Sequence, residues 1–471
     1  MKKVFVFCIG GTGIRVMKSV TMLMASGMST NGYAIVPIIL DPHLDLEEKK
    51  NLHTLIEGYQ DIYNKTTNKG SLNHLEGFFN SEIVTINELN NQVNDTQQAS
   101  GSKEKFRSYI NEANLAADDI NNYLVQTLFS SKNLDSPLSV GFKGNPNVGT
   151  VVLGEMIEGA DWFRAFKQHC EKDDRIFIIS SIFGGTGASG YPLLEKKIKG
   201  SASQPAVKNA VMGAVTVLPY YGLKDPTTNG SDIDSANFYT KTKAALAYYE
   251  KTVLSDYMYY AGETSLIQVY ENDEKRQDDK AHFIELVAAS SLFDFLHREK
   301  PETQQFLTRA IDDAQNSLDL ISLGSGYKEI VKCVADYKLL GLLINVLQTE
   351  KFFPLIKNRG FDNNFYKDAP FQALKKFTEI YDNWYHELST NKRAFSPLNT
   401  DNKKKMEGWV KKLSLDAKDD SYYLLKMIQA SNGNKDKTHE NKFRFFLQFA
   451  HDAINYYTKK IWLSCKSPWM T

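Results

Sequence analysis

Short apolar runs alternate with amphipathic segments along the first part of the chain. Residues 3–9 form a continuous run of β-branched and aromatic side chains, and residues 33–40 form a second run that ends at an Asp-Pro pair. Such continuous runs are typical of parallel strands covered on both faces. Between them, residues 14–27 carry apolar side chains at helical spacing. This order of strand, loop, helix and strand predicts the start of a doubly wound α/β sheet.

The same alternation returns after a long polar stretch, residues 45–135, which we expect to be a helical insertion. Beyond it we expect helices at 151–171, 190–199, 236–254 and 280–297, and strands at 175–183, 209–221 and 264–271. The last of these helices is apolar on most of its circumference, so it should be buried. Long helical stretches dominate after it. The expected organisation is an α/β domain at 1–279, a core helix at 280–298 and a mostly helical C-terminal domain at 299–471.

The composition indicates an ordinary globular protein. Hydrophobic residues make up 42% of the 471 residues, which argues against disorder. Lys+Arg and Asp+Glu number 56 each, so the charge balance does not indicate a nucleic-acid partner. The four cysteines are scattered, which is typical of unbridged thiols in a reducing compartment. No apolar run approaches the roughly 20 residues of a membrane span. We therefore expect a cytoplasmic protein.

Two of the predicted strands end in a similar glycine-rich loop that leads into a helix. These loops are GGTGIR at 10–15 and GGTGASG at 184–190. Glycines allow successive backbone N–H groups to converge on phosphate oxygens, and the helix that follows adds free N–H groups and the positive end of its dipole. One such loop can be a steric turn. Two of them, at the carboxyl edge of one sheet, predict a phosphate site.

The sequence does not match the other common phosphate motifs. It has no GxxxxGK[ST], so it is not a P-loop protein. The second loop fits GxGxxG, but no acidic residue follows about 20 positions later. The first loop has the acidic residue, Asp41, at the end of the next strand, but it lacks the third glycine, because Val16 occupies that position. An NAD(P)-binding oxidoreductase of the Rossmann type therefore stays open as a remote alternative.

Three segments carry a resemblance to a known superfamily. GGTGASG resembles the GGGTG[ST]G signature of tubulin and FtsZ. The single additional change from that signature is the alanine at position 188, Ala188. GNPNVG at 144–149 resembles the [GA]NPEVG loop of FtsZ, and DKAHFIEL at 279–286 resembles the start of the tubulin core helix. Over about residues 1–298 the chain resembles divergent bacterial tubulin-like proteins of the tubulin/FtsZ superfamily. The resemblance implies a tubulin/FtsZ-type domain with a parallel-rich central sheet, a long buried core helix and a largely helical C-terminal region.

The resemblance also implies GTP or GDP with Mg²⁺ as ligands, and it assigns residues to them. The α- and β-phosphates would contact Gly10, Gly11, Thr12 and Gly13. The β- and γ-phosphates would contact Gly184, Gly185, Thr186, Gly187, Ala188, Ser189 and Gly190. The γ-phosphate would be sensed by Gly144, Asn145 and Gly149. Asn237 is a candidate for ribose, and an ordinary helix cap is an equally open interpretation of it.

The chain also departs from the family's pattern. Ala281 stands where the family carries the amide or carboxylate that reads guanine, with His282 beside it, and Ile14 stands where many members carry Asn or Gln. In polymerising members an acidic loop after the core helix orients the attacking water. Here the corresponding stretch has Glu299 and Glu302 without the Asn-x-Asp pattern, and a solvated helix end explains them as well. The base identity and the GTPase activity therefore stay open at this point.

The function expected from these observations is nucleotide-dependent self-assembly of a tubulin-like protein, with or without GTP hydrolysis. The alternative is a non-polymerising, nucleotide-binding regulatory protein with little or no hydrolysis. The partner would be another copy of the chain, or a protein bound through the C-terminal region. A bulky residue in place of Gly187 is expected to abolish binding without unfolding the protein.

Overall fold

The fold is described from a computed structural model of the chain. It describes residues 1–43, 47–66, 77–90, 104–116, 119–138, 142, 144–223, 238–263, 268–270, 280–311, 317–318, 328–348, 360–391, 394–395 and 441–464.

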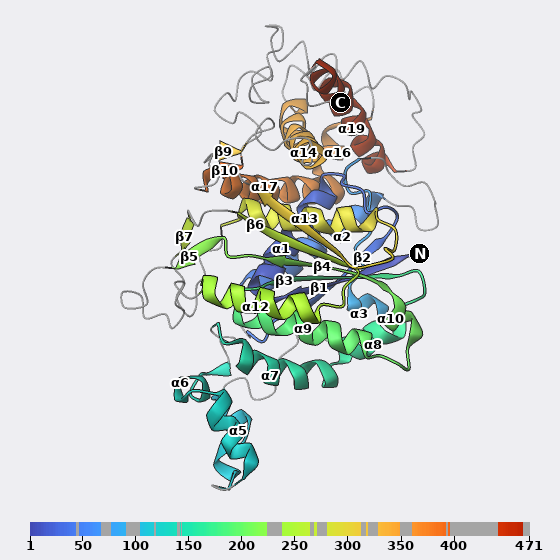
Figure 1. The fold of residues 1–471 in the computed structure, drawn as a ribbon. Coiled ribbons are helices and arrows are strands. Elements are labelled where there is room, and N and C mark those ends of the chain that lie inside the picture. The colour runs from blue at the N-terminus through green and yellow to red at the C-terminus, as the bar shows by residue number, and fades with distance from the viewer. Residues whose placement is uncertain are drawn as a thin grey trace.

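A six-stranded, all-parallel sheet forms the centre of the molecule (Figure 1). Its strands are β1 (Lys3–Ile9), β2 (Ala34–Leu40), β3 (Arg175–Ser181), β4 (Val211–Val217), β6 (Tyr257–Glu263) and β8 (Gln305–Ile311). Their order across the sheet is β2-β1-β3-β4-β6-β8. Every residue of β1 and β2 is buried, as the continuous apolar runs require. The predicted α/β class with a parallel-rich sheet is confirmed.

Helices cover both faces of this sheet (Figure 1). One face carries α1 (Gly10–Ala25), α2 (Glu47–Thr66) and α13 (Phe283–Leu296), and the other carries α7 (Pro146–Gly159), α8 (Asp161–His169), α9 (Gly185–Lys199), α10 (Pro205–Asn209) and α12 (Phe238–Thr252). Successive residues of β1 point into two different cores, with Val4 and Val6 on the α1 side and Phe5 and Phe7 on the other. Twelve of the residues of α13 are buried, in agreement with the expected core helix.

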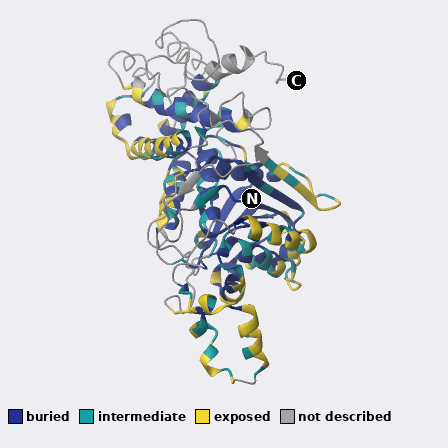
Figure 2. Ribbon diagram, turned by 60° about the vertical axis from the view of Figure 1, so that its left-hand side comes forward, coloured by how far each residue is buried: buried dark blue, intermediate teal, exposed yellow. Residues whose placement is uncertain are grey.

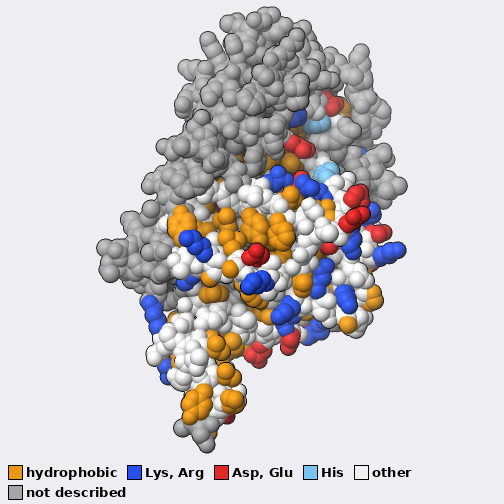
Figure 3. Space-filling model, in the orientation of Figure 1, with side chains coloured by type: hydrophobic (Ala, Val, Ile, Leu, Met, Phe, Trp, Pro, Cys, Tyr) orange, Lys and Arg blue, Asp and Glu red, His pale blue; other side chains and the backbone are white. Residues whose placement is uncertain are grey.

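The described part of the insertion at 45–135 is mostly helical. After α2 it contains α3 (Ile86–Leu89), α4 (Phe106–Tyr109), a 3₁₀ turn (Glu112–Asn114), α5 (Ile120–Leu128) and α6 (Ser131–Leu134). Helix α5 projects from the body of the molecule and has no buried residue (Figures 1 and 2). Figure 3 shows apolar side chains on this projection, where Ile120 and Tyr123 are 72% and 64% exposed.

The C-terminal part packs on the α1 face of the sheet. Its described elements are α14 (Lys328–Leu347), α16 (Asn363–Lys367), α17 (Ala369–Thr390), α19 (Lys442–Ser464) and the short strands β9 (Ser317–Leu318) and β10 (Ala394–Phe395). Helix α17 contacts α2, and α14 contacts both α1 and α19. This region is mostly helical where it is described, as expected. Among the described residues, no helix is both long and apolar enough to cross a membrane.

Several predicted elements differ from the observed ones. The strand expected at 264–271 does not join the main sheet, whose strand in this part of the chain is β6, at Tyr257–Glu263. The range instead holds β7 (Gln268–Tyr270), which pairs with β5 (Tyr221–Leu223). The helix expected at 151–171 is two helices that break at Ala160. Strand β8 was not expected, and it extends the sheet past residue 298. The division into domains stays a prediction.

Candidate functional site

The two glycine-rich segments follow two strands that are neighbours in the sheet. From β1 the sheet continues to β2 on one side and to β3 on the other, so the order of the strands reverses between β1 and β3. In open α/β sheets ligands bind outside the carboxyl ends of the strands at such a reversal. Gly10 follows β1 directly, and Gly184 lies three residues beyond β3. The topology therefore places both segments at the preferred binding position of this class of fold.

The two segments are in contact with each other. Gly10 has a φ of +72°, which glycine adopts without strain. A Cβ on Gly10 would lie 3.4 Å from the Cβ of Thr186 and 3.7 Å from the backbone nitrogen of Gly187. The segments predicted to share one phosphate site thus lie side by side at one edge of the sheet.

The GNPNVG segment adjoins the second glycine segment. A Cβ on Gly185 would lie 3.1 Å from the nitrogen of Gly144 and 3.2 Å from the nitrogen of Asn145. One turn further on, a Cβ on Gly149 would lie 2.3 Å from Ser189 Oγ, so the absence of a side chain at 149 lets α7 pack closely on α9. The two glycine-rich segments and the GNPNVG segment therefore meet at one place.

Each of the three segments forms the first turn of a helix of at least 14 residues. In the described part of the chain, no side chain at the N-cap of α1, α7 or α9 accepts a hydrogen bond from the helix, and no acidic residue lies in their first turns. The first N–H groups of an α-helix have no partner within the helix, and the helix dipole makes this end positive. Three such ends together fit a polyanion such as a triphosphate.

Some of the predicted site residues also have a packing role. Cβ atoms on Gly13, Gly187 and Gly190 would lie 2.7 Å from Cys8 C, 2.5 Å from Ser181 O and 2.7 Å from Ile9 Cγ2, so these glycines let α1 and α9 approach the strands. The Ser189 hydroxyl donates to the carbonyl oxygen of Gly185 at 2.7 Å and is buried. Thr12 is buried as well, whereas Gly11, Thr186 and Ala188 are partly exposed at the helix starts.

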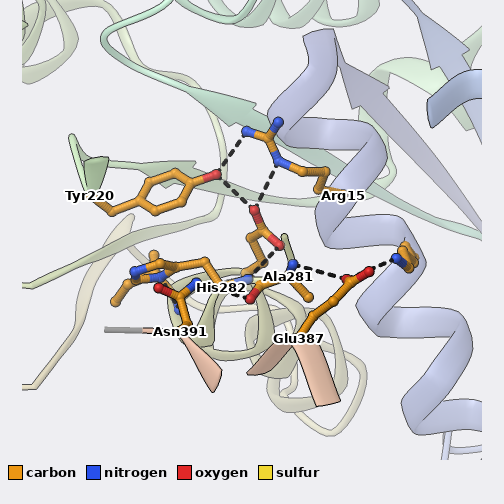
Figure 4. A network of polar contacts seen from close by, with 9 residues as sticks. Arg15, Tyr220, Ala281, His282, Glu387 and Asn391 are labelled. Carbon is orange, nitrogen blue, oxygen red and sulfur yellow. Dashed lines mark hydrogen bonds and ion pairs between the residues drawn. The ribbon is translucent and has the colours of Figure 1, made fainter. Parts of the chain in front are cut away.

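A buried polar network lies behind the first glycine segment (Figure 4). The Nε of Arg15 donates to Glu285 Oε1 at 2.8 Å, and Arg15 Nη2 donates to the Tyr220 hydroxyl at 2.8 Å. The same hydroxyl donates to Glu285 Oε1 at 2.8 Å. The network joins α1, the loop after β4 and α13, and its three residues are at most 8% exposed. A buried ion pair held by further hydrogen bonds fixes these elements to one another.

The start of the core helix is held from both sides. Ala281, the residue at the expected base-reading position, is buried, and its backbone N–H donates to Glu387 Oε2 at 3.1 Å. Asn391 Nδ2 donates to the carbonyl oxygen of Ala281 at 3.2 Å (Figure 4). His282 is fully buried, and its Nδ1 accepts from the backbone of Ile284. Ile14, the other departure, is also buried. The methyl side chain of Ala281 offers no hydrogen bond to a base.

The carboxyl end of β2 adds a buried acid at the same edge. Leu40 pairs with Ile9 in the sheet, so Asp41 follows β2 beside Gly10. Asp41 is 5% exposed and accepts from the backbone N–H of His43 at 2.8 Å. Burial raises the pKa of its carboxyl to about 6, against the opposing effects of that bond and of Lys49. In the described part of the chain no group of three or more His, Cys, Asp or Glu side chains could hold a metal ion.

One cation near the three helix starts was missed from the sequence. Lys241, in the first turn of α12, donates from Nζ to the carbonyl oxygen of Gly144 at 2.7 Å. No local pattern marks this lysine, because the contact joins positions almost 100 residues apart. Asn237, the ribose candidate, lies outside the described residues.

The two glutamates after the core helix lie at the other edge of the sheet. Glu299 and Glu302 are exposed, and they precede β8 in a parallel sheet. Tyr257, the first residue of β6, donates from its hydroxyl to the carbonyl oxygen of Glu299 at 2.6 Å. The structure therefore separates these glutamates from the glycine segments of the same chain by the length of the strands.

The comparisons with known proteins leave the family open. No family model matches the sequence, and no curated protein matches it. Among solved structures, the chain is similar to CetZ from Methanosaeta thermophila strain DSM 6194, with a TM-score of 0.25 and 14% sequence identity. The match covers 56% of this chain and 46% of that chain, which is less than half of its length.

The candidate site consists of three helix starts that meet where the strand order reverses. The buried network of Arg15, Tyr220 and Glu285 adjoins the first of them, and Lys241 contacts Gly144 at the third.

Proposed function

We propose that the chain binds a nucleoside triphosphate, with its phosphates at the starts of α1, α9 and α7. The observation that carries this proposal is the contact of Gly10 with Thr186 and Gly187 where the strand order reverses. Three helix starts without acidic side chains concentrate positive potential at that point. A bound polyanion with its Mg²⁺ would neutralise this potential and satisfy the N–H groups.

We favour GTP because GGTGASG and GNPNVG resemble the corresponding segments of tubulin and FtsZ. The side chain of Ala281 does not support a particular base. The favoured activity is nucleotide-dependent self-assembly, with the other copy of the chain as the partner. Since Glu299 and Glu302 lie at the opposite edge of the sheet, they can approach a triphosphate only in a second copy stacked edge to edge.

A non-polymerising, nucleotide-binding regulatory protein is the second candidate. It is favoured by the lack of an Asn-x-Asp pattern near Glu299 and by the contacts of α17 with α2 and with the start of the core helix. In that case the C-terminal region transmits the nucleotide state to another protein. An NAD(P)-binding oxidoreductase is the remote third candidate, and Val16, which is fully buried, fills its third glycine position.

The test starts with the purified full-length chain. The nucleotide released on denaturation is identified by chromatography, and binding of GTP, GDP, ATP and NADH is measured by calorimetry. Sedimentation with and without GTP then separates the first two candidates, because the self-assembling protein pellets only with nucleotide and the regulatory protein stays in solution. Absence of binding to every nucleotide would overturn the proposal, and binding of NADH alone would favour the oxidoreductase.

A further inference from the structure

Lys241 occupies a position that its own helix disfavours. It is the fourth residue of α12, and the first turn of that helix has no acidic side chain. A cation near the N-terminus of a helix opposes the helix dipole and destabilises the helix. A charge placed there needs compensation from outside the helix.

The contacts of Lys241 place its charge beside the candidate phosphate site. Its Nζ donates to the carbonyl oxygen of Gly144 at 2.7 Å and lies 3.3 Å from the position of a Cβ on that residue. The nitrogen of Gly144 in turn lies 3.1 Å from the position of a Cβ on Gly185. A single residue, Gly144, therefore lies between the ammonium group and the start of α9. The lysine belongs to α12, an element that contains none of the glycine segments.

The helix starts form a row that ends at Lys241. The start of α1 contacts the start of α9 through Gly10 and Thr186, and the start of α9 contacts the segment before α7 through Gly185 and Gly144. Lys241 contacts Gly144, the member of the row that is farthest from α1 in this series of contacts. A chain of phosphates laid along the row from the α1 side brings its last phosphate to the lysine.

We infer that Lys241 is a ligand of the terminal phosphate and makes the site prefer a nucleoside triphosphate to the diphosphate. The inference rests on the proposed function. An ammonium group has three donors on a flexible stem, so it can hold Gly144 and a phosphate oxygen together. A diphosphate ends one position earlier in the row and does not reach Lys241. The preference follows from this difference in contact.

The experiment replaces the lysine and compares two ligands. Binding of Mg²⁺ with GDP, and with a non-hydrolysable GTP analogue, is measured by calorimetry for the full-length chain and for Lys241→Met. Loss of a charge-assisted hydrogen bond should weaken triphosphate binding by about 10- to 100-fold. The affinity for GDP should change by less than about 3-fold, within the scatter of a remote substitution.

Two further variants control the test. Lys243→Met removes an exposed lysine two residues further along α12, and it should leave both affinities unchanged. Lys241→Gln keeps an amide that can donate to Gly144 but removes the charge, and it should lose the triphosphate preference with the same melting temperature as the unaltered chain. This variant keeps the test valid if the methionine variant does not fold.

The outcomes separate this inference from the proposed function. Equal losses of GDP and triphosphate affinity would mean that Lys241 acts only by holding Gly144, and they would overturn the inference. Unchanged binding in both Lys241 variants would overturn it as well. In each of these cases the unaltered chain binds nucleotide and the proposed function stands. If the unaltered chain binds neither ligand, the proposed function fails, and the inference fails with it.

Discussion

Gly184 is a residue at which helix capping and ligand binding compete for the same N–H groups. It precedes α9 with φ −84° and ψ 169°, the extended conformation of an N-cap residue. A Cβ there would have one tight contact, 3.1 Å from Ser181 Oγ, which rotation of the serine side chain can relieve. An aspartate therefore fits this position and would accept the hydrogen bonds that we assign to phosphate.

For Gly184→Asp we expect nucleotide binding to weaken by more than about 100-fold, because two like charges cannot share a desolvated site. The melting temperature should stay the same or rise, since an N-cap aspartate stabilises a helix by roughly 0.3–1 kcal/mol through the dipole. Calorimetry and thermal unfolding measure the two effects. Gly184→Asn is the matched control, with a similar cap and no charge, and should bind better than the aspartate variant. Normal binding by Gly184→Asp would remove α9 from the site.

Gly187, in the same loop, has a packing role that the sequence alone does not reveal. The sequence predicts that a bulky residue there abolishes binding without unfolding the protein, and the structure contradicts the second part of this prediction. A Cβ would lie 2.5 Å from the carbonyl oxygen and 2.7 Å from the nitrogen of Ser181, and backbone atoms of a central strand cannot move aside. The glycine pattern predicts where the backbone turns. It does not distinguish a glycine that faces the ligand from one that faces the strand.

At the scale of elements, a buried ion pair between Arg15 and Glu285 holds the first glycine helix, α1, against the core helix, α13. Arg15 on α1 and Glu285 on α13 are 8% and 2% exposed, and Tyr220 bonds to both. The elements that hold the candidate phosphate site and those that lead to the C-terminal part thus share one buried charge pair. Its geometry should decide how rigidly α1 is placed.

Glu285→Gln should lower the free energy of unfolding by about 3–5 kcal/mol, because it breaks the buried ion pair between Arg15 and Glu285. Tyr220→Phe removes one hydroxyl and should cost only about 1–3 kcal/mol. Urea unfolding followed by circular dichroism measures both. An equal, small effect of the two substitutions would show that the ion pair does not fasten α1 to α13.

The sequence predicts these elements unevenly, for physical reasons. Strands β1 and β3 are buried on both faces, so their continuous apolar runs are unmistakable. Strand β8 has no such run, since it is at the edge of the sheet and Phe306 is 51% exposed. Helices α1 and α9 begin within the glycine segments, although glycine disfavours the helical conformation. Glycine is needed at these positions because the helices pack so closely on the strands that a side chain would not fit. Lys241 and the Arg15 network depend on contacts between distant segments, which no local pattern encodes.

For the whole molecule, the described hydrophobic core runs without a break from the sheet into the C-terminal part. One cluster includes Met17 and Val20 of α1, Leu340 of α14 and Trp384 of α17. The Ser26 hydroxyl also lies 2.8 Å from that of Tyr381 on α17. A separate C-terminal domain would instead have its own core and a smaller, more polar interface. The division predicted at residue 298 can therefore be tested as a question of folding.

A chain that ends at residue 311 keeps all six strands of the sheet and removes α14, α17 and α19. We expect it to expose the apolar face of α1, α2 and α13, to bind a hydrophobic dye and to unfold without a cooperative transition, because those side chains lose the helices that bury them. The full-length chain should show one calorimetric transition with equal calorimetric and van't Hoff enthalpies. Two transitions in the full chain, together with a truncated chain that folds and binds nucleotide, would instead establish two domains. In that case the nucleotide state would reach the C-terminal part through the contacts of Glu387 and Asn391 with Ala281, and not through a shared core.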